Sequence, residues 1–413
     1  MLDLIVIGAG LSGMLAAHTA ARAGARVAIV SKGLGALHWS AGTIDALGYF
    51  PDEKTPVSSP LAALPMLAPN HPYTLCDAPA AWREFAALTH ACGLPYAGAN
   101  ADANLWLPSP AGAARPTWLA PRAQLAGDLA RAEPMLIVGV RGMRDFFPEL
   151  IAENLRKQNH AARAAFVPLE VITARHDSNS VQLAHALDDP ARQLKLAREL
   201  KKIVQRGERI GLPAILGLDN HPNAFQTLEA ETGAAIFEIP TLPPSVPGIR
   251  LNDALRRELH RLGVRVDVNM DVRGFHADGA RIAFVESETS GQPLKHRAEK
   301  FLLATGGILG GGIQSDPTGK TWEAVFDLPL TIAPNRGDWF RARFFDPAGH
   351  PIFRGGVAVN RVFQPVNAHG APVYANLWAA GGVLAHADPI LERSLEGVAI
   401  ATGVAAGKFA SQS

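Results

Sequence analysis

The stretch MLDLIVIGAGLSGMLAAHTAARAGARVAIVSK, residues 1–32, decides the fold that we expect for this chain. The apolar run 4–7 is typical of a buried strand, residues 14–23 are alanine-rich and helical, and residues 27–30 form a second apolar run. Strand, glycine turn, helix and strand follow one another within the roughly 30 residues that a βαβ unit needs. The sequence therefore predicts a βαβ unit of the Rossmann type at the start of the chain.

The turn GAGLSG carries Gly8, Gly10 and Gly13 in the spacing of a dinucleotide fingerprint. Gly8 allows the tight turn, Gly10 leaves the backbone open to a pyrophosphate, and Gly13 lets the helix pack closely on the strand. The free N–H groups at the start of the helix then face the phosphates. We expect dinucleotide or flavin binding, and the alternative is a glycine turn of purely structural use.

The second strand ends in Ser31 and Lys32, where a typical fingerprint has Asp or Glu for the ribose 2′-OH. A serine can still hydrogen-bond a ribose hydroxyl, but without charge. This Ser-Lys ending resembles the succinate dehydrogenase, fumarate reductase and L-aspartate oxidase class of flavoproteins. The alternative is that ribose recognition is weak here.

The composition limits the function classes. The 413 residues include 48% hydrophobic and 19% charged residues, which suits a large globular core. A formal net charge of +1 argues against nucleic-acid binding, because such proteins carry a basic excess. Two cysteines, Cys76 and Cys92, cannot ligate an iron–sulfur cluster alone, and they fit a cytosolic, reducing compartment.

No targeting or membrane segment is expected. The N-terminus is apolar but contains Asp3 and lacks a basic region, and its glycines belong to the βαβ unit, so we do not expect a signal peptide. No run of about 18 or more apolar residues is present. A membrane role would therefore require a partner or a surface.

The middle of the chain also reads as α/β, with a second parallel sheet. Apolar runs predict strands at 135–140, 164–169, 213–218 and 235–239, and amphipathic or polar stretches predict helices at 147–157, 195–206 and 223–232. The fold class that we expect is α/β, with a Rossmann-like flavin-binding domain and an inserted α/β domain. The flavin-binding domain would comprise 1–60, 240–312 and 371–413, the inserted domain 61–239, and a substrate-facing segment 313–370.

Three further stretches predict contacts with a flavin. In ALHWSAGTID, residues 36–45, small residues let the backbone approach a flat ring, whose electronics backbone N–H groups can tune. The strand KFLL ends in ATGG at 304–307, and the strand-like NLWA ends in AGG at 380–382. The predicted cofactor contacts are Gly8, Gly10, Gly13, Ser31, Lys32, Ser40, Ala41, Gly42, Thr305, Gly306, Gly381 and Gly382.

Four segments together carry a closer resemblance. ALHWSAGTID at 36–45, TLPPSVPGIRL at 241–251, the glycine-rich 304–312 and RGDWF at 336–340 resemble the family of B subunits of anaerobic glycerol-3-phosphate dehydrogenase. The resemblance runs from Leu4 to the C-terminal helix. One departure is that Asp-Pro-Ile at 388–390 leads to LERSLEG, where the family tends to have a glycine-rich turn.

The resemblance implies flavin-dependent oxidation of sn-glycerol 3-phosphate to glycerone phosphate, with electrons passed to a quinone. It implies two partners in a complex, a second flavoprotein (the A subunit) and an iron–sulfur membrane protein (the C subunit). The expected location is cytoplasmic and peripheral, at the inner face of the membrane through the complex. The family's cofactor is FMN, whereas the fingerprint favours a pyrophosphate and hence FAD, so both stay open.

A secondary alcohol gives up its hydroxyl proton to a base while a hydride leaves its carbon, and histidine suits this task near neutral pH. The candidates are His38 and His350, and a surface role is the alternative for His38. Arginine forks bind a dianionic phosphate, and the candidates are Arg336, Arg341, Arg343 and Arg354. Their alternative is solubility, or pairing with Asp338 and Asp346.

Two other functions stay open from sequence. One is an independent flavin oxidoreductase acting on another small acid, as in the fumarate reductase class. The other is a non-catalytic flavoprotein subunit that supports a catalytic partner and relays electrons.

Overall fold

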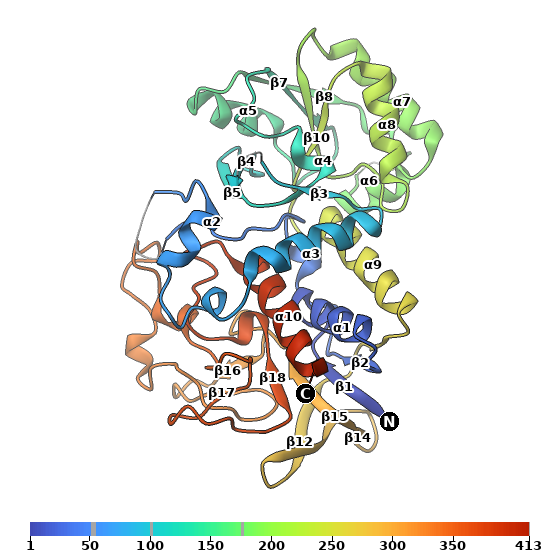
Figure 1. The fold of residues 1–413 in the computed structure, drawn as a ribbon. Coiled ribbons are helices and arrows are strands. Elements are labelled where there is room, and N and C mark those ends of the chain that lie inside the picture. Colours follow the sequence, from blue (N-terminus) through green and yellow to red (C-terminus); the bar gives the residue numbers. More distant parts are fainter. Residues whose placement is uncertain (51–54, 100–101, 175–176, 413) are drawn as a thin grey trace. The chain divides into compact units, whose positions relative to one another are not determined.

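Strand β1 (Leu2–Ile7) is the central strand of a five-stranded sheet in the computed structural model, which describes residues 1–50, 55–99, 102–174 and 177–412 (Figure 1). The order is β11 (Arg265–Asp267), β2 (Val27–Val30), β1, β15 (Ala298–Leu303) and β18 (Leu377–Ala379). All four pairings are parallel. The apolar ends of β1 and β15 and all of β2 and β18 are buried, as expected for a parallel sheet covered on both faces.

The chain divides into two units. The first unit comprises residues 1–36, 45–88 and 254–413 and contains this sheet, and the second comprises 37–44 and 89–253. Helices α3 (Ala78–Ala91) and α9 (Val246–Arg261) include residues where the chain passes from one unit to the other. The division by role expected from sequence stays a prediction.

Helix α1 (Leu11–Arg22) packs on the C-terminal helix α10 (Leu395–Gln412) through small residues. A Cβ on Gly403 would lie 2.5 Å from the carbonyl oxygen of Ser12, and one on Gly407 would lie 2.5 Å from that of Ala16. The two backbones therefore approach at a distance that only glycine permits. This contact fixes the last helix against the glycine turn.

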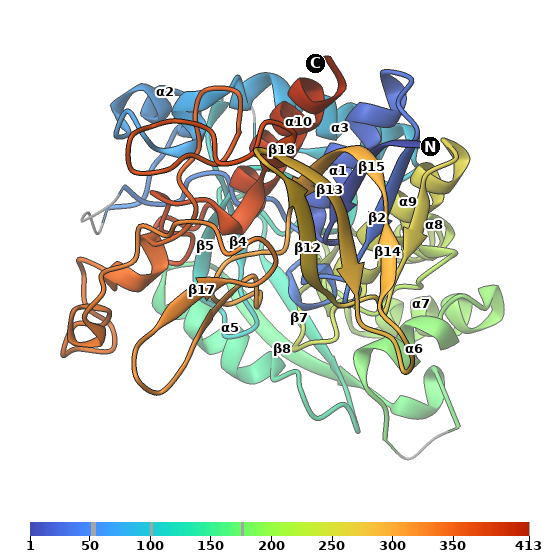
Figure 2. The ribbon, with the colours of Figure 1, turned by 90° about the horizontal axis from the view of Figure 1, so that it is seen from below.

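Smaller elements complete the first unit (Figure 2). Strands β12 (Val272–Asp278), β13 (Arg281–Ser287) and β14 (Leu294–His296) form an antiparallel meander, and β16 (Ile313–Ser315) pairs with β17 (Thr321–Glu323). Helix α2 (Pro60–Ala63) is short. Among the residues described, no helix is long and apolar enough to span a bilayer.

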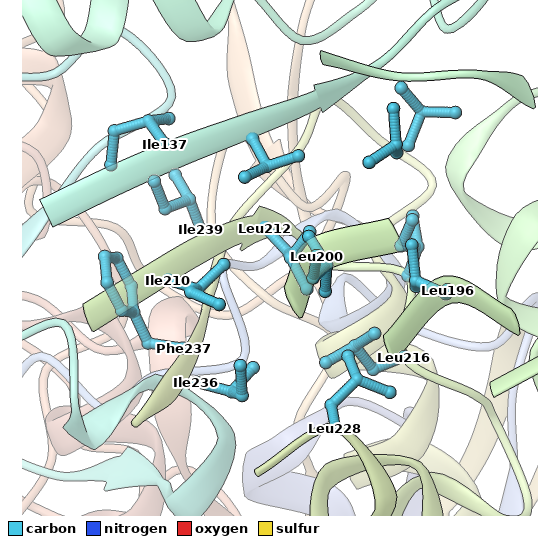
Figure 3. Close-up of a cluster of buried hydrophobic side chains, with 14 of the residues drawn as sticks. Ile137, Leu196, Leu200, Ile210, Leu212, Leu216, Leu228, Ile236, Phe237 and Ile239 are labelled. Atoms are coloured by element: carbon cyan, nitrogen blue, oxygen red, sulfur yellow. The ribbon is translucent and has the colours of Figure 1, made fainter. Parts of the chain in front are cut away.

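The second unit has its own four-stranded parallel sheet in the order β10 (Ile236–Ile239), β9 (Arg209–Pro213), β7 (Met135–Val140) and β8 (Ala162–Val167). Figure 3 shows its core, in which Ile137, Leu212 and Phe237 of the strands lie near Leu200 and Leu228 of the helices. The helices are α4 (Arg122–Leu125), α5 (Pro148–Lys157), α6 (Ser180–Ala186), α7 (Pro190–Ile203) and α8 (His221–Thr232), and two short antiparallel pairs join β3 (Tyr96–Ala97) to β6 (Ala120–Pro121) and β4 (Leu105–Pro108) to β5 (Ala114–Thr117).

The second parallel sheet is confirmed, but the strand predicted at 213–218 is wrong. Strand β9 begins earlier, at Arg209, whose side chain is buried. Its guanidinium donates hydrogen bonds to the carbonyl oxygens of Ala126 (2.6 Å) and Asp128 (3.0 Å), so backbone acceptors satisfy the charge. Because Arg209 is charged, a search for runs of apolar residues does not include it, and the start of the strand is not predicted.

Candidate functional site

The glycine loop between β1 and α1 has the geometry that a dinucleotide fingerprint requires. Gly8 has a φ of 116°, and a Cβ there would overlap the carbonyl oxygen of Ala304. A Cβ on Gly13 would overlap the carbonyl oxygen of Gly8. By contrast, no atom lies within 4 Å of the place that a Cβ on Gly10 would take. A ligand can therefore reach the backbone at Gly10 and at no other glycine of the fingerprint.

The first turn of α1 offers free hydrogen-bond donors beside that opening. Gly10 is the N-cap, no side chain caps this end, and the first turn contains no acidic residue. The N–H groups and the positive end of the helix favour a phosphate. The Ser12 hydroxyl in this turn is buried and has no partner among the described residues. Sequence reasoning missed Ser12, although it stands inside the fingerprint.

The ends of β15 and β18 meet this loop. Thr305 and Gly306 follow β15, and Gly381 follows β18, each of these two glycines with a φ of 80°. A Cβ on Gly381 would lie 2.7 Å from the Ser12 Cβ, and one on Gly307 would overlap the carbonyl oxygen of Gly382. The structure therefore brings the three glycine-containing strand ends together at one edge of the sheet.

A second free hydroxyl lies at this edge. The Thr305 hydroxyl is buried and, like that of Ser12, has no partner in the part of the chain that the structure describes. Buried hydroxyls normally find a partner. Two such hydroxyls at the glycine edge fit a flavin dinucleotide, whose pyrophosphate and ribose supply acceptors and donors.

Ser31 and Lys32 have partners of their own. The Ser31 hydroxyl accepts from the Ala9 N–H (3.2 Å) and donates to the Gly33 carbonyl, so it braces the glycine loop. Lys32 Nζ lies 3.1 Å from Asp271 Oδ2. Their predicted role as ribose ligands stays a prediction, and the structure shows a bracing role for the serine.

The predicted ring-facing residues 38–42 belong to the second unit. The Ala41 carbonyl accepts from Gln124 Nε2 (2.9 Å), and the Ser40 hydroxyl donates to the Leu37 carbonyl (3.0 Å). Gly42 has a φ of 73°, and a Cβ there would overlap Pro247. The loop 36–45 thus packs on the segment 241–251, and two stretches that carried the resemblance meet.

The two candidate bases differ in what their rings contact. His350 Nδ1 accepts from the Arg341 N–H (3.1 Å) and Nε2 donates to the Phe344 carbonyl (2.9 Å), so neither nitrogen is free. Nδ1 of His38 is buried and has no partner among the described residues. Of these two histidines, only His38 therefore has a ring nitrogen that could accept a proton from a substrate.

The candidate phosphate arginines each have separate neighbours. Arg336 Nη1 donates to the Pro317 carbonyl (3.0 Å), and Arg341 Nε donates to the Gly349 carbonyl (3.1 Å). Arg343 is exposed. Arg354 Nε lies 4.0 Å from the buried Asp388 carboxylate. The contacts of these four arginines do not bring them together at one anion site. Their role in binding the substrate phosphate stays a prediction.

A buried acid cluster that sequence reasoning missed lies in the departing segment 388–394. Glu392 accepts from His71 Nε2 (3.1 Å), from the Ser394 hydroxyl (2.9 Å) and from the Asp388 N–H (3.0 Å). His71 Nδ1 accepts from a backbone N–H, which makes Nε2 the protonated nitrogen. Burial raises the pKa of Asp388 above its usual range. The cluster anchors residues 71–73 to the turn before α10. His71 and Glu392 are far apart in sequence, so no short motif predicts that they form a pair.

Comparison with known proteins identifies the family. Residues 3–394 match the model of the FAD binding domain family. The chain is 35% identical over 418 residues to the B subunit of anaerobic glycerol-3-phosphate dehydrogenase from Yersinia pseudotuberculosis, with 97% of this chain and 96% of that protein covered. It is 33% identical to the probable B subunit of the same enzyme from Halobacterium salinarum, with 99% and 98% covered.

These findings confirm the α/β flavoprotein fold and the flavin, and of the two alternatives they support FAD. They also confirm a flavin oxidoreductase role in its general form. The name of the relatives marks them as one subunit of a larger complex. The chain belongs to the FAD binding domain family and, within it, to the B subunits of anaerobic glycerol-3-phosphate dehydrogenase.

Proposed function

We propose that this chain acts as the B subunit of an anaerobic glycerol-3-phosphate dehydrogenase, which oxidises sn-glycerol 3-phosphate to glycerone phosphate and passes the electrons to a quinone. The observation that carries the proposal is the open glycine edge of the first unit, in a chain related to such subunits over nearly its full length. A bound flavin would supply the hydride acceptor.

The chain's own residues would hold that flavin. Residues 1–60, 240–312 and 371–413 form the flavin-binding part of the proposal, with Gly10, Ser12 and Thr305 at the phosphates and ribose. His38 would take the hydroxyl proton at its free Nδ1. Residues 61–239 form the inserted domain, and 313–370 face the substrate.

The electrons would leave through partners. The sequence contains two cysteines, fewer than the four thiolates that a common iron–sulfur cluster needs. We therefore assign onward transfer to the second flavoprotein, the A subunit, and to the iron–sulfur membrane protein, the C subunit. The complex would hold this chain at the inner face of the membrane.

The test is an absorbance spectrum of the purified chain under anaerobic conditions, with the extracted flavin identified. Bleaching of the flavin band by sn-glycerol 3-phosphate would support a catalytic role. Bleaching only when the partner flavoprotein is present would favour the supporting role, and bleaching by succinate instead would favour the fumarate reductase class. Purified, correctly folded chain without flavin after reconstitution with FAD would contradict the proposal.

A further inference from the structure

The first unit contains a cavity of about 310 Å³ that none of the predicted site residues lines. Its wall comes from three segments far apart in sequence, 69–75, 357–361 and 385–386. Its apolar lining includes Pro72, Leu75, Val357 and Ala385, and its ionisable residues are Arg361 and His386. A mostly apolar cavity with a few polar groups is the usual form of a small-molecule site.

Hydrogen bonds hold the cavity wall in place. The Val357 N–H donates to the Val383 carbonyl (2.8 Å), and the Ala385 N–H donates to the Val357 carbonyl (3.0 Å). Pro72, which also lines the cavity, follows His71, which is fixed by Glu392. The site is thus formed before any ligand arrives, which lowers the entropy cost of binding.

One short stretch of chain contributes to both the cofactor edge and the cavity lining. A Cβ on Gly381 would contact Ser12 at the start of α1, and His386, five residues later, lines the cavity. Both residues lie in the first unit.

His386 has a backbone that few side chains adopt. Its φ is 76°, in the left-handed region, and its N–H donates to the Arg354 carbonyl (2.9 Å). Such strain is retained where the surroundings fix it, and it accumulates at functional sites. Burial lowers the pKa of His386, so the ring is neutral near pH 7 and offers one donor and one acceptor.

Arg361 supplies the charge. It is exposed, and it makes no ion pair among the described residues. The Asn360 side-chain oxygen accepts from the N–H groups of Val362 (3.1 Å) and Gln364 (3.0 Å), which fixes the turn that carries the arginine. A guanidinium fork on a rigid turn is suited to the oxygens of a phosphate.

We propose that this cavity binds a small phosphomonoester, with Arg361 on the phosphate, His386 hydrogen-bonded to the hydroxyl that is not oxidised, and the apolar side chains beside the carbon chain. The inference rests on the proposed function: it assigns the phosphate of sn-glycerol 3-phosphate to Arg361 rather than to the arginines of 336–354, and it leaves the hydroxyl proton to His38. A three-carbon phosphomonoester is small enough for the cavity.

The experiment is calorimetric titration of the intact, flavin-loaded chain with sn-glycerol 3-phosphate, glycerol and inorganic phosphate. A hydrogen bond to a charged group is worth roughly 1.5–3 kcal/mol, so Arg361→Ala should weaken glycerol 3-phosphate about ten- to a hundredfold. Arg361→Lys should restore part of the loss. The matched control is Arg83→Ala, which changes an exposed arginine of α3 and should leave binding unchanged.

The outcomes separate this inference from the proposed function. Arg361-dependent binding of glycerol 3-phosphate without its oxidation, alone or with the partner flavoprotein, would support the cavity and contradict the function. Oxidation with a KM that Arg361→Ala does not change would overturn the cavity and leave the function standing. Inorganic phosphate that binds as tightly as glycerol 3-phosphate, or a wild-type chain that binds neither, would also overturn the cavity. Thermal unfolding confirms that each variant is folded.

Discussion

At the scale of single residues, the three fingerprint glycines have different tasks. The open space at Gly10 accepts a side chain, whereas a Cβ on Gly13 overlaps the Gly8 carbonyl. Gly10→Val should therefore keep the fold and lose the flavin, because the new side chain occupies the path of the phosphates. Gly13→Val should lose flavin and stability together. Extracted flavin and the thermal midpoint of both variants check this, and full flavin in Gly10→Val would refute the fingerprint.

His38 gives a second residue-scale prediction. If its free Nδ1 takes the hydroxyl proton, His38→Gln should lower kcat for glycerol 3-phosphate about a hundred- to ten-thousandfold with flavin content unchanged, as for loss of a general base. A higher KM with an unchanged kcat would show that His38 positions the substrate.

Glu323 makes stability depend on pH. Burial raises its pKa to about 7, although its carboxylate accepts from the N–H groups of Phe326 (2.7 Å) and Val325 (2.9 Å). The unfolded chain ionises this group near 4.5, so the folded state is favoured most below that pH and loses the advantage up to about 7. Between these values the free energy of unfolding should fall by about 1.4 kcal/mol per pH unit on account of Glu323.

The measurement is denaturant unfolding of the wild type and Glu323→Gln at several pH values from 4 to 8. Glutamine keeps an acceptor oxygen but does not titrate. The difference in unfolding free energy between the two proteins should therefore vary with pH between about 4.5 and 7 and become constant above that range. A difference that is constant throughout would mean that the carboxyl has an ordinary pKa.

At the scale of elements, the contact of α1 with α10 is the feature most open to a test. Gly403→Val places a side chain against the Ser12 backbone and should cost about 1–3 kcal/mol, the usual range for overpacking. Helix propensity alone would favour valine over glycine slightly. A loss of stability would therefore indicate overpacking against α1, and a small gain would indicate that propensity dominates. Ala405→Val, at a half-exposed position of the same helix, is the control and should change stability little.

Elements that depend on local sequence could be predicted, and those that depend on distant partners could not. The strands at 27–30 and 135–140 follow from apolar runs, and β2 and β7 have these bounds. Strand β9 was missed because it begins with a charged residue, Arg209. Its buried guanidinium donates to carbonyl groups that are distant in sequence, such as that of Ala126, and these partners cannot be recognised from the local pattern. The helix expected at 195–206 begins at Pro190, because Asp189 caps it by accepting from the Ala191 N–H.

The site divides in the same way. Most of its glycines were predictable, because a positive φ or a close backbone contact restricts these positions to one residue type, whereas Gly10 is recognised only by its spacing from Gly8 and Gly13. The pairing of His71 with Glu392 and the cavity of Arg361 and His386 were not, because their members are brought together only by tertiary structure. Glycine motifs can be recognised in the sequence, whereas side-chain contacts between residues far apart in the chain cannot.

At the scale of the whole molecule, the proposal predicts how the chain reaches a membrane. Among the described residues no helix can span a bilayer, and the net charge of +1 gives little attraction to anionic lipid. We expect the isolated chain to stay unbound in flotation with vesicles of neutral or anionic phospholipid, and to float only with its partner subunits.

Flotation of the isolated chain would contradict this. Phe344 and Phe345 would then be the first residues to substitute, because they are large apolar side chains that are 82% and 90% exposed. Their ring centroids lie 4.8 Å apart in an edge-to-face arrangement, so the two rings form one apolar patch. Loss of flotation in a double Ser variant would make that loop a lipid contact.

The strand order of the first sheet also bears on how the protein is made. Strands β2 and β1 are synthesised long before β15, which begins at residue 298, and β18, which begins at residue 377, yet β1 lies between β2 and β15. The glycine edge is therefore incomplete until β18 has been synthesised. A nascent chain released before β18 should leave the ribosome without its cofactor.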